Sequence, residues 1–246
     1  STLACLPSQT IAFMGAEGSR HSTPTTRTCS SFSWNTGGDV WFSAAVIEVP
    51  SRVSYELLDR DDAGERLLVL VHGYGLPSSE LTDRVDMIDP KRRRTVAVPQ
   101  APFEHRGLRI WHRAGHTAAE IAMEQYLASV RLLDDLLGEL ETGSGLSAED
   151  AVVGGFSQGG IMALSLLRTQ PALLQAAMVM HSRLLPEVDA LAAPAQALNG
   201  KQLWVSHGLQ DGVIPIANAR AIRDLASTLP VALTYNEYPC AHEIRA

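Results

Sequence analysis

Short apolar runs alternate along the chain with longer segments whose apolar residues recur at helical spacing, and this alternation constrains the fold most strongly. Runs such as 67–71 and 151–153 contain no polar residue. Such runs are typical of strands that are covered on both faces of a sheet. Strands that alternate with helices predict right-handed crossovers and a mainly parallel sheet with helices on both faces. We therefore expect an α/β fold with its chemistry at the carboxyl ends of the strands.

The same pattern gives approximate bounds for the elements. The expected strands are 53–57, 67–71, 95–98, 151–153, 176–180, 203–205 and 231–238. The expected helices are 79–88, 118–141, 158–169 and 216–229. Residues 1–50 contain clusters of Ser, Thr and Gly without a clear period, so we interpret them as a partly ordered N-terminal extension. Residues 51–246 are then the α/β domain.

Composition and charge exclude several classes of protein. No apolar run approaches the roughly 18–20 residues that a helix needs to span a bilayer, so we expect no integral membrane segment. The net charge of −7 argues against a general nucleic-acid or anionic-membrane surface. The basic run at 91–94 is interpreted as a solvated turn ahead of a strand.

The cysteines indicate neither a disulfide framework nor a metal site. Cys5, Cys29 and Cys240 are few and match no zinc-ligand spacing, so we expect cytosolic thiols and no metal. A cytoplasmic location follows from this interpretation. Residues 2–5 resemble the end of a bacterial lipoprotein signal, but no basic, apolar leader stands before them, and we interpret the similarity as coincidental.

Residues 155–159, Gly-Phe-Ser-Gln-Gly, fit the pattern G-x-S-x-G. They lie between an apolar strand and a helical segment, and in that context the pattern predicts a sharp turn that presents the hydroxyl of Ser157 as a nucleophile. The helix that follows would direct backbone N–H groups toward a developing oxyanion. A glycine-rich turn with a capping serine is the structural alternative.

A serine nucleophile requires a base, and the base is sought downstream of Ser157. The candidates are His181, His207 and His242. His181 and His207 each stand at the end of an expected strand and are more easily packed or hydrogen-bonded residues. His242 follows the last expected strand, where the base of this architecture belongs, so we predict that it is the general base.

The base needs a carboxylate to orient it. Asp211 lies just beyond the strand 203–205, in a loop that can carry it toward His242. Glu187 and Asp189 compete with it, but they lie in a connection rich in Pro and Ala rather than at a clear strand end. We therefore predict that Asp211 is the acid.

An oxyanion hole needs two donors. The backbone N–H of Gln158, directly after the nucleophile, is the first candidate. The second is the backbone N–H of Tyr74, because glycines on both sides of it let the loop 72–75 turn. A phosphate cradle is the alternative for this loop, but no G-K-[ST] follows. We expect His72 to be a buried, hydrogen-bonding residue.

Three segments, 155–160, 207–215 and 238–243, resemble the phospholipase/carboxylesterase family, which includes acyl-protein thioesterases and small bacterial carboxylesterases. Residues 99–102, with Trp111 downstream, are similar to the segment that lines the acyl pocket in this family. The resemblance covers roughly residues 52–246. It implies an α/β-hydrolase fold, a serine mechanism without metal or cofactor, and ester or thioester substrates.

The sequence also departs from the family pattern. Leu76 stands where the family usually has Asp, so the oxyanion loop is expected to be held differently. Only four residues follow His242, where the family has a helix. Apolar surface would then be exposed unless another segment covers it, and the N-terminal extension with Trp34 and Trp41 is one candidate.

Together these residues predict a serine carboxylesterase that hydrolyses short- to medium-chain acyl esters, with Trp111 bordering the acyl site. Its partner is a small-molecule acyl ester. An acyl-protein thioesterase or a lysophospholipase remains an alternative, because the same triad serves those leaving groups. A catalytically silent binding module is the alternative from a different class. Cys240, two residues before His242, is interpreted as a packing residue.

Overall fold

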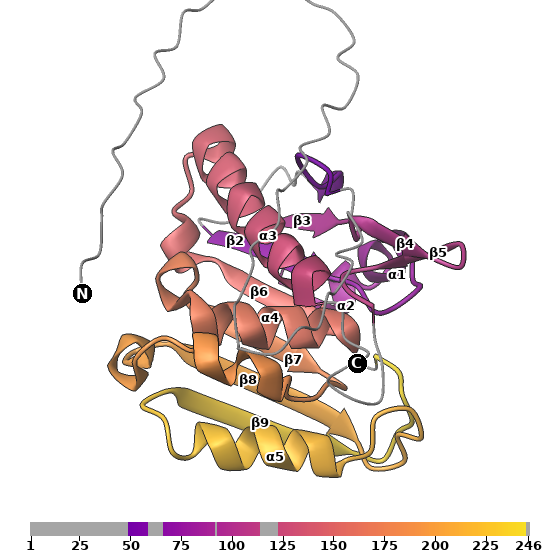
Figure 1. Cartoon of the computed structure of the whole chain (residues 1–246), viewed down its shortest axis with the longest axis vertical. Helices are drawn as coiled ribbons and strands as arrows, with labels where there is room; N and C mark the ends of the chain where they lie inside the picture. Colours follow the sequence, from indigo (N-terminus) through magenta and orange to yellow (C-terminus); the bar gives the residue numbers. More distant parts are fainter. Residues whose placement is uncertain (1–48, 59–65, 92, 114–122, 245–246) are drawn as a thin grey trace, which may run out of the picture.

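The computed structural model describes residues 49–58, 66–91, 93–113 and 123–244. The strands of its central sheet are β1 (Tyr55–Leu58), β2 (Arg66–Val71), β3 (Arg94–Pro99), β6 (Val152–Phe156), β7 (Ala176–Met180), β8 (Gln202–Gly208) and β9 (Ala232–Tyr238). Their spatial order is β1-β3-β2-β6-β7-β8-β9 (Figure 1). Only β1 runs antiparallel to its neighbour, so the expected, mainly parallel sheet is confirmed.

Helices lie on both faces of this sheet. They are α1 (Ser79–Thr82), α2 (Val85–Ile88), α3 (Met123–Ser144), α4 (Gln158–Thr169) and α5 (Ala217–Ala226). Short 3-10 turns occupy Ala148–Asp150, Pro171–Leu173, Pro186–Leu191 and Ala195–Leu198. Within the described ranges, no helix has both the length and the apolar character that crossing a membrane requires.

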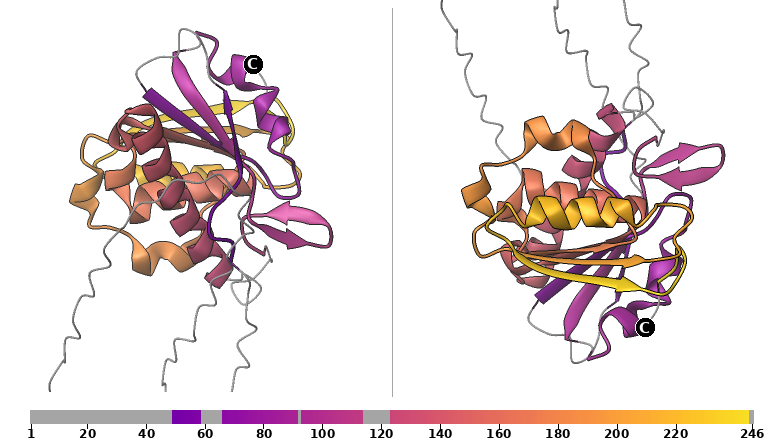
Figure 2. Two further views of the ribbon diagram at one scale, coloured as in Figure 1. Left: turned by 90° about the horizontal axis from the view of Figure 1, so that it is seen from above. Right: turned by 90° about the horizontal axis from the view of Figure 1, so that it is seen from below.

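The apolar run of β2 is buried against helices on both faces of the sheet. Leu67 and Val69 belong to a cluster with buried residues of α3, α4 and α5, while Leu68 and Leu70 belong to a second cluster with residues of α1 and α2. Figure 2 shows the two layers, with α5 and α4 on one side of the sheet and α1 and α2 on the other. The continuous apolar run is thus the consequence of burial on both faces.

The second face is covered less completely than the first. Val152, Met178 and Trp204 pack against its cluster but remain partly exposed. No helix follows β9 in the part of the chain that the structure describes, and Ile244 packs against this cluster instead. The predicted extension, residues 1–50, lies outside the described residues except for Val49 and Pro50.

Two local features differ from the elements expected from the sequence. The segment 79–88 forms two short helices rather than one. The reason is that the carbonyl of Glu80 accepts from the side chain of Arg84, while the backbone N–H of Arg84 donates to the carbonyl of Leu81. The hairpin of β4 (Phe103–His105) and β5 (Leu108–Ile110) was not expected. Its turn residues, Arg106 and Gly107, both have positive φ, which is the geometry of a two-residue hairpin turn.

Two glycines allow α4 to begin directly against the sheet. A Cβ atom at Gly155 would overlap the carbonyl group of Gly159, and one at Gly159 would overlap the carbonyl oxygen of Val71. Since the opposing atoms are backbone, they cannot rotate away. The first turn of α4 is therefore fixed against the ends of β2 and β6.

Replacing Gly155 with alanine tests this packing. Gly155→Ala should lower the free energy of unfolding by about 3 kcal/mol, because neither backbone segment can yield. Gly138→Ala is the matched control, since Gly138 is exposed in α3 and an added methyl meets nothing within 4 Å. It should raise stability by about 0.5–1 kcal/mol. Urea unfolding of both variants measures the difference, and equal stabilities would contradict the packing argument.

Candidate active site

Ser157 occupies the single residue between β6 and α4, in a backbone conformation of φ 55° and ψ −115°. A positive φ is uncommon for a residue with a side chain and persists only where the surroundings enforce it. Here the N–H of Ser157 donates to the carbonyl of Met180 (2.9 Å), and its carbonyl accepts from the hydroxyl of Ser182 (2.8 Å). The end of β7 and the residues just after it thus hold the strained turn through both its N–H and its carbonyl group.

The loop after β2 passes beside this serine. A Cβ atom built at Gly73 would lie 3.3 Å from the Cβ of Ser157. The N–H of Gly75 donates to the carbonyl of Arg109 in β5 (2.8 Å), so the hairpin holds the loop in place. Among the described residues, the backbone N–H groups of Tyr74 and Gln158 donate to no acceptor. Two unused donors therefore lie on either side of the Ser157 turn.

His72 supports this loop from inside. Its Nε2 accepts from the N–H of Ala101 (2.9 Å), so its Nδ1 carries the proton and donates to the carbonyl of Gly73 (2.8 Å). Burial lowers the pKa of His72, which keeps the ring neutral. The expectation that His72 is a buried, hydrogen-bonding residue is confirmed.

Trp111 has a different position from the one expected. Its side chain is completely buried, and its indole N–H donates to the carbonyl of His72 (3.0 Å). Its ring lies 5.5 Å from the ring of His72. Trp111 was expected to border the acyl site, and the structure places its side chain in the core beneath the loop 72–75.

The side chain of Gln158 has a role that the sequence did not reveal. Its Oε1 accepts from the N–H of Trp111 (2.9 Å), and its Nε2 donates to the carbonyl of His112 (2.7 Å). The amide is buried, and it joins the first residue of α4 to the chain that follows β5. The side chain of Gln158 therefore connects the turn at Ser157 to Trp111, whose indole contacts the loop 72–75.

Asp211 and His242 come together because the loops after β8 and β9 are joined along their backbones. Leu209 donates to the carbonyl of Tyr238 (2.7 Å), and Gln210 donates to that of Cys240 (3.0 Å). At Gly208 the two loops approach so closely that a Cβ atom would overlap the carbonyl oxygen of Cys240.

The carboxylate of Asp211 is buried and uses both oxygens. Its Oδ1 accepts from the N–H groups of Val213 (2.9 Å) and Ile214 (2.8 Å). Its Oδ2 lies 2.7 Å from Nδ1 of His242. The ring of His242 packs against Phe156, with a centroid distance of 4.7 Å, and so lies next to the residue before Ser157. No hydrogen bond joins the Ser157 hydroxyl to His242 within the described ranges.

Two further histidines, both read from the sequence as packed or hydrogen-bonded residues, contact the same carboxylate. Nδ1 of His181 lies 3.0 Å and Nε2 of His207 lies 3.2 Å from Oδ2 of Asp211. His207 also donates from Nε2 to the carbonyl of Ile214 (2.7 Å). The sequence indicated only that both histidines stand at or just beyond the ends of strands, and not that they share a carboxylate.

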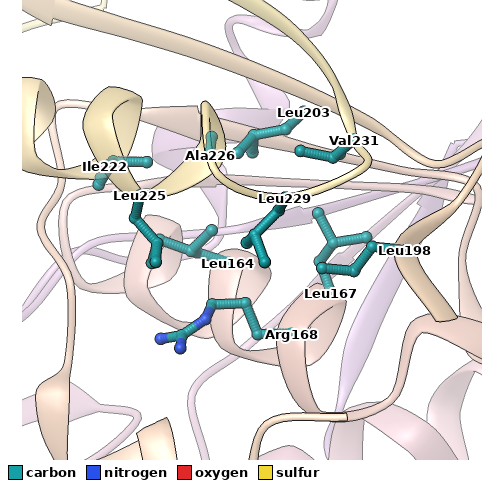
Figure 3. Close-up of a pocket in the computed structure, with 10 residues that line it drawn as sticks. All are labelled: Leu164, Leu167, Arg168, Leu198, Leu203, Ile222, Leu225, Ala226, Leu229 and Val231. Carbon is teal, nitrogen blue, oxygen red and sulfur yellow. The ribbon is translucent and has the colours of Figure 1, made fainter. Parts of the chain in front are cut away.

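The competing carboxylates lie elsewhere. Glu187 and Asp189 belong to the 3-10 turn Pro186–Leu191, and Asp189 pairs with Arg168 of α4 (2.7 Å). Arg168 also borders an apolar hollow between α4, α5 and β8 (Figure 3). This hollow is lined by Leu164, Leu167, Arg168, Leu198, Leu203, Ile222, Leu225, Ala226, Leu229 and Val231, none of which belongs to the candidate site.

The charge state of Asp211 decides what the histidines can do. Burial by itself would raise the pKa of the Asp211 carboxyl. Hydrogen bonds from the imidazoles of His242 and His181 and from two backbone N–H groups outweigh burial, so the pKa is lowered to about 2. The carboxylate is thus ionised at neutral pH and can only accept. Nδ1 of His242 must then carry a proton, which leaves its Nε2 available as a base.

The atom types of this cluster would also suit a metal ion. One ligand atom each from His181, Asp211 and His242 lie within 4.8 Å of one another. Two ligand atoms that each lie about 2.0–2.1 Å from a tetrahedral zinc ion stand roughly 3.3 Å from one another. The distances of 2.7 and 3.0 Å between the two Nδ1 atoms and Oδ2 are those of hydrogen bonds. We therefore assign these residues to proton chemistry.

Comparison with known proteins places this chain in a family. Residues 56–246 match the phospholipase/carboxylesterase family. The chain belongs to that family. The resemblance seen in the sequence is thereby confirmed, and the protein is a serine hydrolase of the carboxylic ester class. No curated protein matches the sequence significantly.

Solved structures share the fold at low sequence identity. A carboxylesterase from Bacillus cereus superposes with a TM-score of 0.69 at 19% identity, covering 79% of this chain and 89% of that chain. A carboxylesterase from Mesorhizobium loti gives 0.68 at 20% identity, covering 79% and 89%. SOBER1 from Arabidopsis thaliana gives 0.62 at 19% identity, covering 73% and 92%. These likenesses confirm the α/β-hydrolase fold.

A methyl group at Gly208 should separate Asp211 from His242. Gly208→Ala forces the loops after β8 and β9 apart, and a displacement near 1 Å can cost about 100-fold in kcat/KM. Gly212→Ala is the control in the same loop, since Gly212 is exposed and its added methyl meets nothing within 4 Å. Steady-state kinetics on a p-nitrophenyl ester should show the loss only in Gly208→Ala. A similar loss in both variants would contradict the role of this contact.

Asp211 also predicts how stability depends on pH. Its pKa of about 2 lies below the ordinary value of 3.8, so its contribution is complete above about pH 4 and is lost as pH falls toward 2. The difference in unfolding free energy between wild type and Asp211→Asn should therefore shrink over that interval. Urea unfolding at several pH values measures it, and a constant difference would show that the carboxylate is not stabilised in its charged form.

Proposed function

We propose that the protein is a serine carboxylesterase that hydrolyses short- to medium-chain acyl esters through Ser157, His242 and Asp211. The observation that carries this proposal is the buried carboxylate of Asp211, 2.7 Å from Nδ1 of the partly exposed His242, beside a strained serine turn. This combination supports a nucleophile, a base and an orienting carboxylate in one place. Esterase chemistry is also the activity of the family to which the chain belongs.

In the proposed reaction, the hydroxyl of Ser157 attacks the acyl carbonyl while Nε2 of His242 takes its proton. Asp211 holds the Nδ1 proton of His242 and stabilises the imidazolium that forms. The N–H groups of Tyr74 and Gln158 stabilise the oxyanion. The imidazolium then protonates the leaving alcohol, which gives an acyl-enzyme on Ser157. Water, activated by the same base, releases the acid and regenerates the serine.

Exposed apolar side chains near the site support acyl esters of modest length. Leu108 of the hairpin is 42% exposed and lies over Gly75 of the oxyanion loop. Val213, in the loop of Asp211, is 68% exposed. Such open apolar surface can hold a short acyl chain, whereas a long chain gains most when it is enclosed. We therefore propose a preference for short and medium chains.

Kinetics on a panel of p-nitrophenyl esters from C4 to C16 tests this proposal. Wild type should hydrolyse the shorter esters best, and Ser157→Ala should lose at least about 10⁴-fold in kcat while keeping its fold. Ser227→Ala, at an exposed position after α5, is the matched control and should keep its activity. Near-normal turnover by Ser157→Ala would overturn the assignment of the nucleophile.

The same panel separates the alternatives. Adding an acyl thioester and a lysophospholipid tests for an acyl-protein thioesterase or a lysophospholipase, and much faster turnover of either would replace the carboxylester as the proposed substrate. A folded wild type that turns over none of these substrates would favour a catalytically silent binding module.

A further inference from the structure

His181 is a buried residue whose contacts the proposed triad does not require. It follows β7 directly, with a φ of 50°, and its N–H donates to the carbonyl of Ser206 in β8 (2.9 Å). A histidine at positive φ, 3% exposed, is costly in backbone conformation and in burial of a polar ring. Such a residue is expected to make an interaction that compensates for this cost.

The interaction is with the carboxylate of Asp211. Nδ1 of His181 lies 3.0 Å from Oδ2, the same oxygen that Nδ1 of His242 approaches at 2.7 Å. Since the carboxylate is ionised, it can only accept, and both imidazoles must present an N–H. The two rings meet edge to face, with centroids 5.6 Å apart and planes inclined by 87°. One carboxylate oxygen is thus shared by these two histidines, with His207 farther away at 3.2 Å.

We propose that His181 is a positioning residue for the reaction, which fixes the carboxylate of Asp211 and competes with His242 for the acceptor Oδ2. This inference rests on the proposed function, because it needs His242 to be the base. His181 takes no proton in the reaction. The proton of Ser157 goes to Nε2 of His242 and then to the leaving group.

The physical reason is competition for one acceptor. The imidazolium of His242 is stabilised by the charge on Oδ2, and a second N–H donor on that oxygen offsets part of this stabilisation. Removing the second donor should therefore strengthen the interaction of Oδ2 with the imidazolium. At the same time, the second donor restricts rotation of the carboxyl group, which keeps Nε2 of His242 aimed at its target.

The groups around His181 are consistent with a neutral donor. The titratable groups that face it in the described structure are Asp211, His242 and His207 of β8, while β6 contributes the ring of Phe156. Burial lowers the pKa of His181, so the ring is uncharged at neutral pH. His207 stacks on it at 5.1 Å but makes its shorter hydrogen bond to Ile214, so it is the weaker donor to Oδ2.

Two substitutions separate the donor from the ring. His181→Leu removes the N–H at similar volume. His181→Asn keeps a neutral N–H donor near the position of Nδ1, and asparagine accepts positive φ more readily than most residues. The measurements are kcat and the pH profile of kcat/KM, whose acid limb reports the pKa of the base in the free enzyme. Proton NMR of the hydrogen-bonded imidazole N–H groups gives a readout independent of activity.

For His181→Leu we expect the acid limb to move up by about 0.5–1 pH unit and kcat to fall about 3- to 10-fold. For His181→Asn we expect the acid limb to stay within about 0.3 pH unit of wild type, with kcat within about threefold of it. The two imidazole N–H protons of His181 and His242, bonded to Asp211, should lie farthest downfield in the wild-type spectrum, and one of them is lost in either variant.

An unchanged or lowered acid limb in His181→Leu, or a shift in His181→Asn equal to that in His181→Leu, would overturn the proposal. If His181→Leu fails to fold, a single downfield proton in wild type, or a displaced acid limb in His181→Asn, overturns it equally. An inactive wild type that shows both protons would instead refute the proposed function, and the positioning role with it.

Discussion

A buried negative charge holds the candidate site together. An ionised carboxylate away from water is costly unless donors surround it, and the donors to Asp211 come from three places in the fold. Two backbone N–H groups belong to its own loop, one imidazole follows β7, and another follows β9. Satisfying this one group therefore brings together side chains from the carboxyl ends of three adjacent parallel strands, and His242 acquires its orientation as a consequence.

The position of Ser157 depends on a different constraint, which is the contact of α4 with the sheet. Because Gly155 and Gly159 have no side chains, the helix begins against the ends of β2 and β6 and leaves Ser157 with a positive φ. The same contact brings the loop after β2 beside the serine. In this account, the acid–base pair and the nucleophile are positioned by separate parts of the structure that meet at one edge of the sheet.

The sequence predicted those parts of the fold that follow from long apolar runs and strongly restricted turns. The turn at Ser157 was readable because a strand, a helix and its glycines all point to one conformation. The hairpin β4–β5 was missed since its strands have three residues each, too short for a period to be visible. The depth of Trp111 could not be read from the sequence, because an aromatic residue near a predicted site has the same sequence signal whether it lines the site or packs beneath it.

The role of His181 could not be read from the sequence for a similar reason. A histidine at a strand end predicts only a polar group near the edge of the sheet, and its partner depends on how β7, β8 and β9 are aligned. That alignment is a tertiary property, set by the pairing of Met180 with Ser206 and by the contact between the loops after β8 and β9.

The most direct test of the central claim is to locate the activated serine chemically. Wild type, His242→Ala and Asp211→Ala would be treated with a fluorophosphonate, and the modified peptide would be identified by mass spectrometry. The account predicts rapid and exclusive modification of Ser157 in wild type, and strongly slowed modification in both variants. Modification of another residue, or modification of Ser157 that is equally fast without His242, would contradict it.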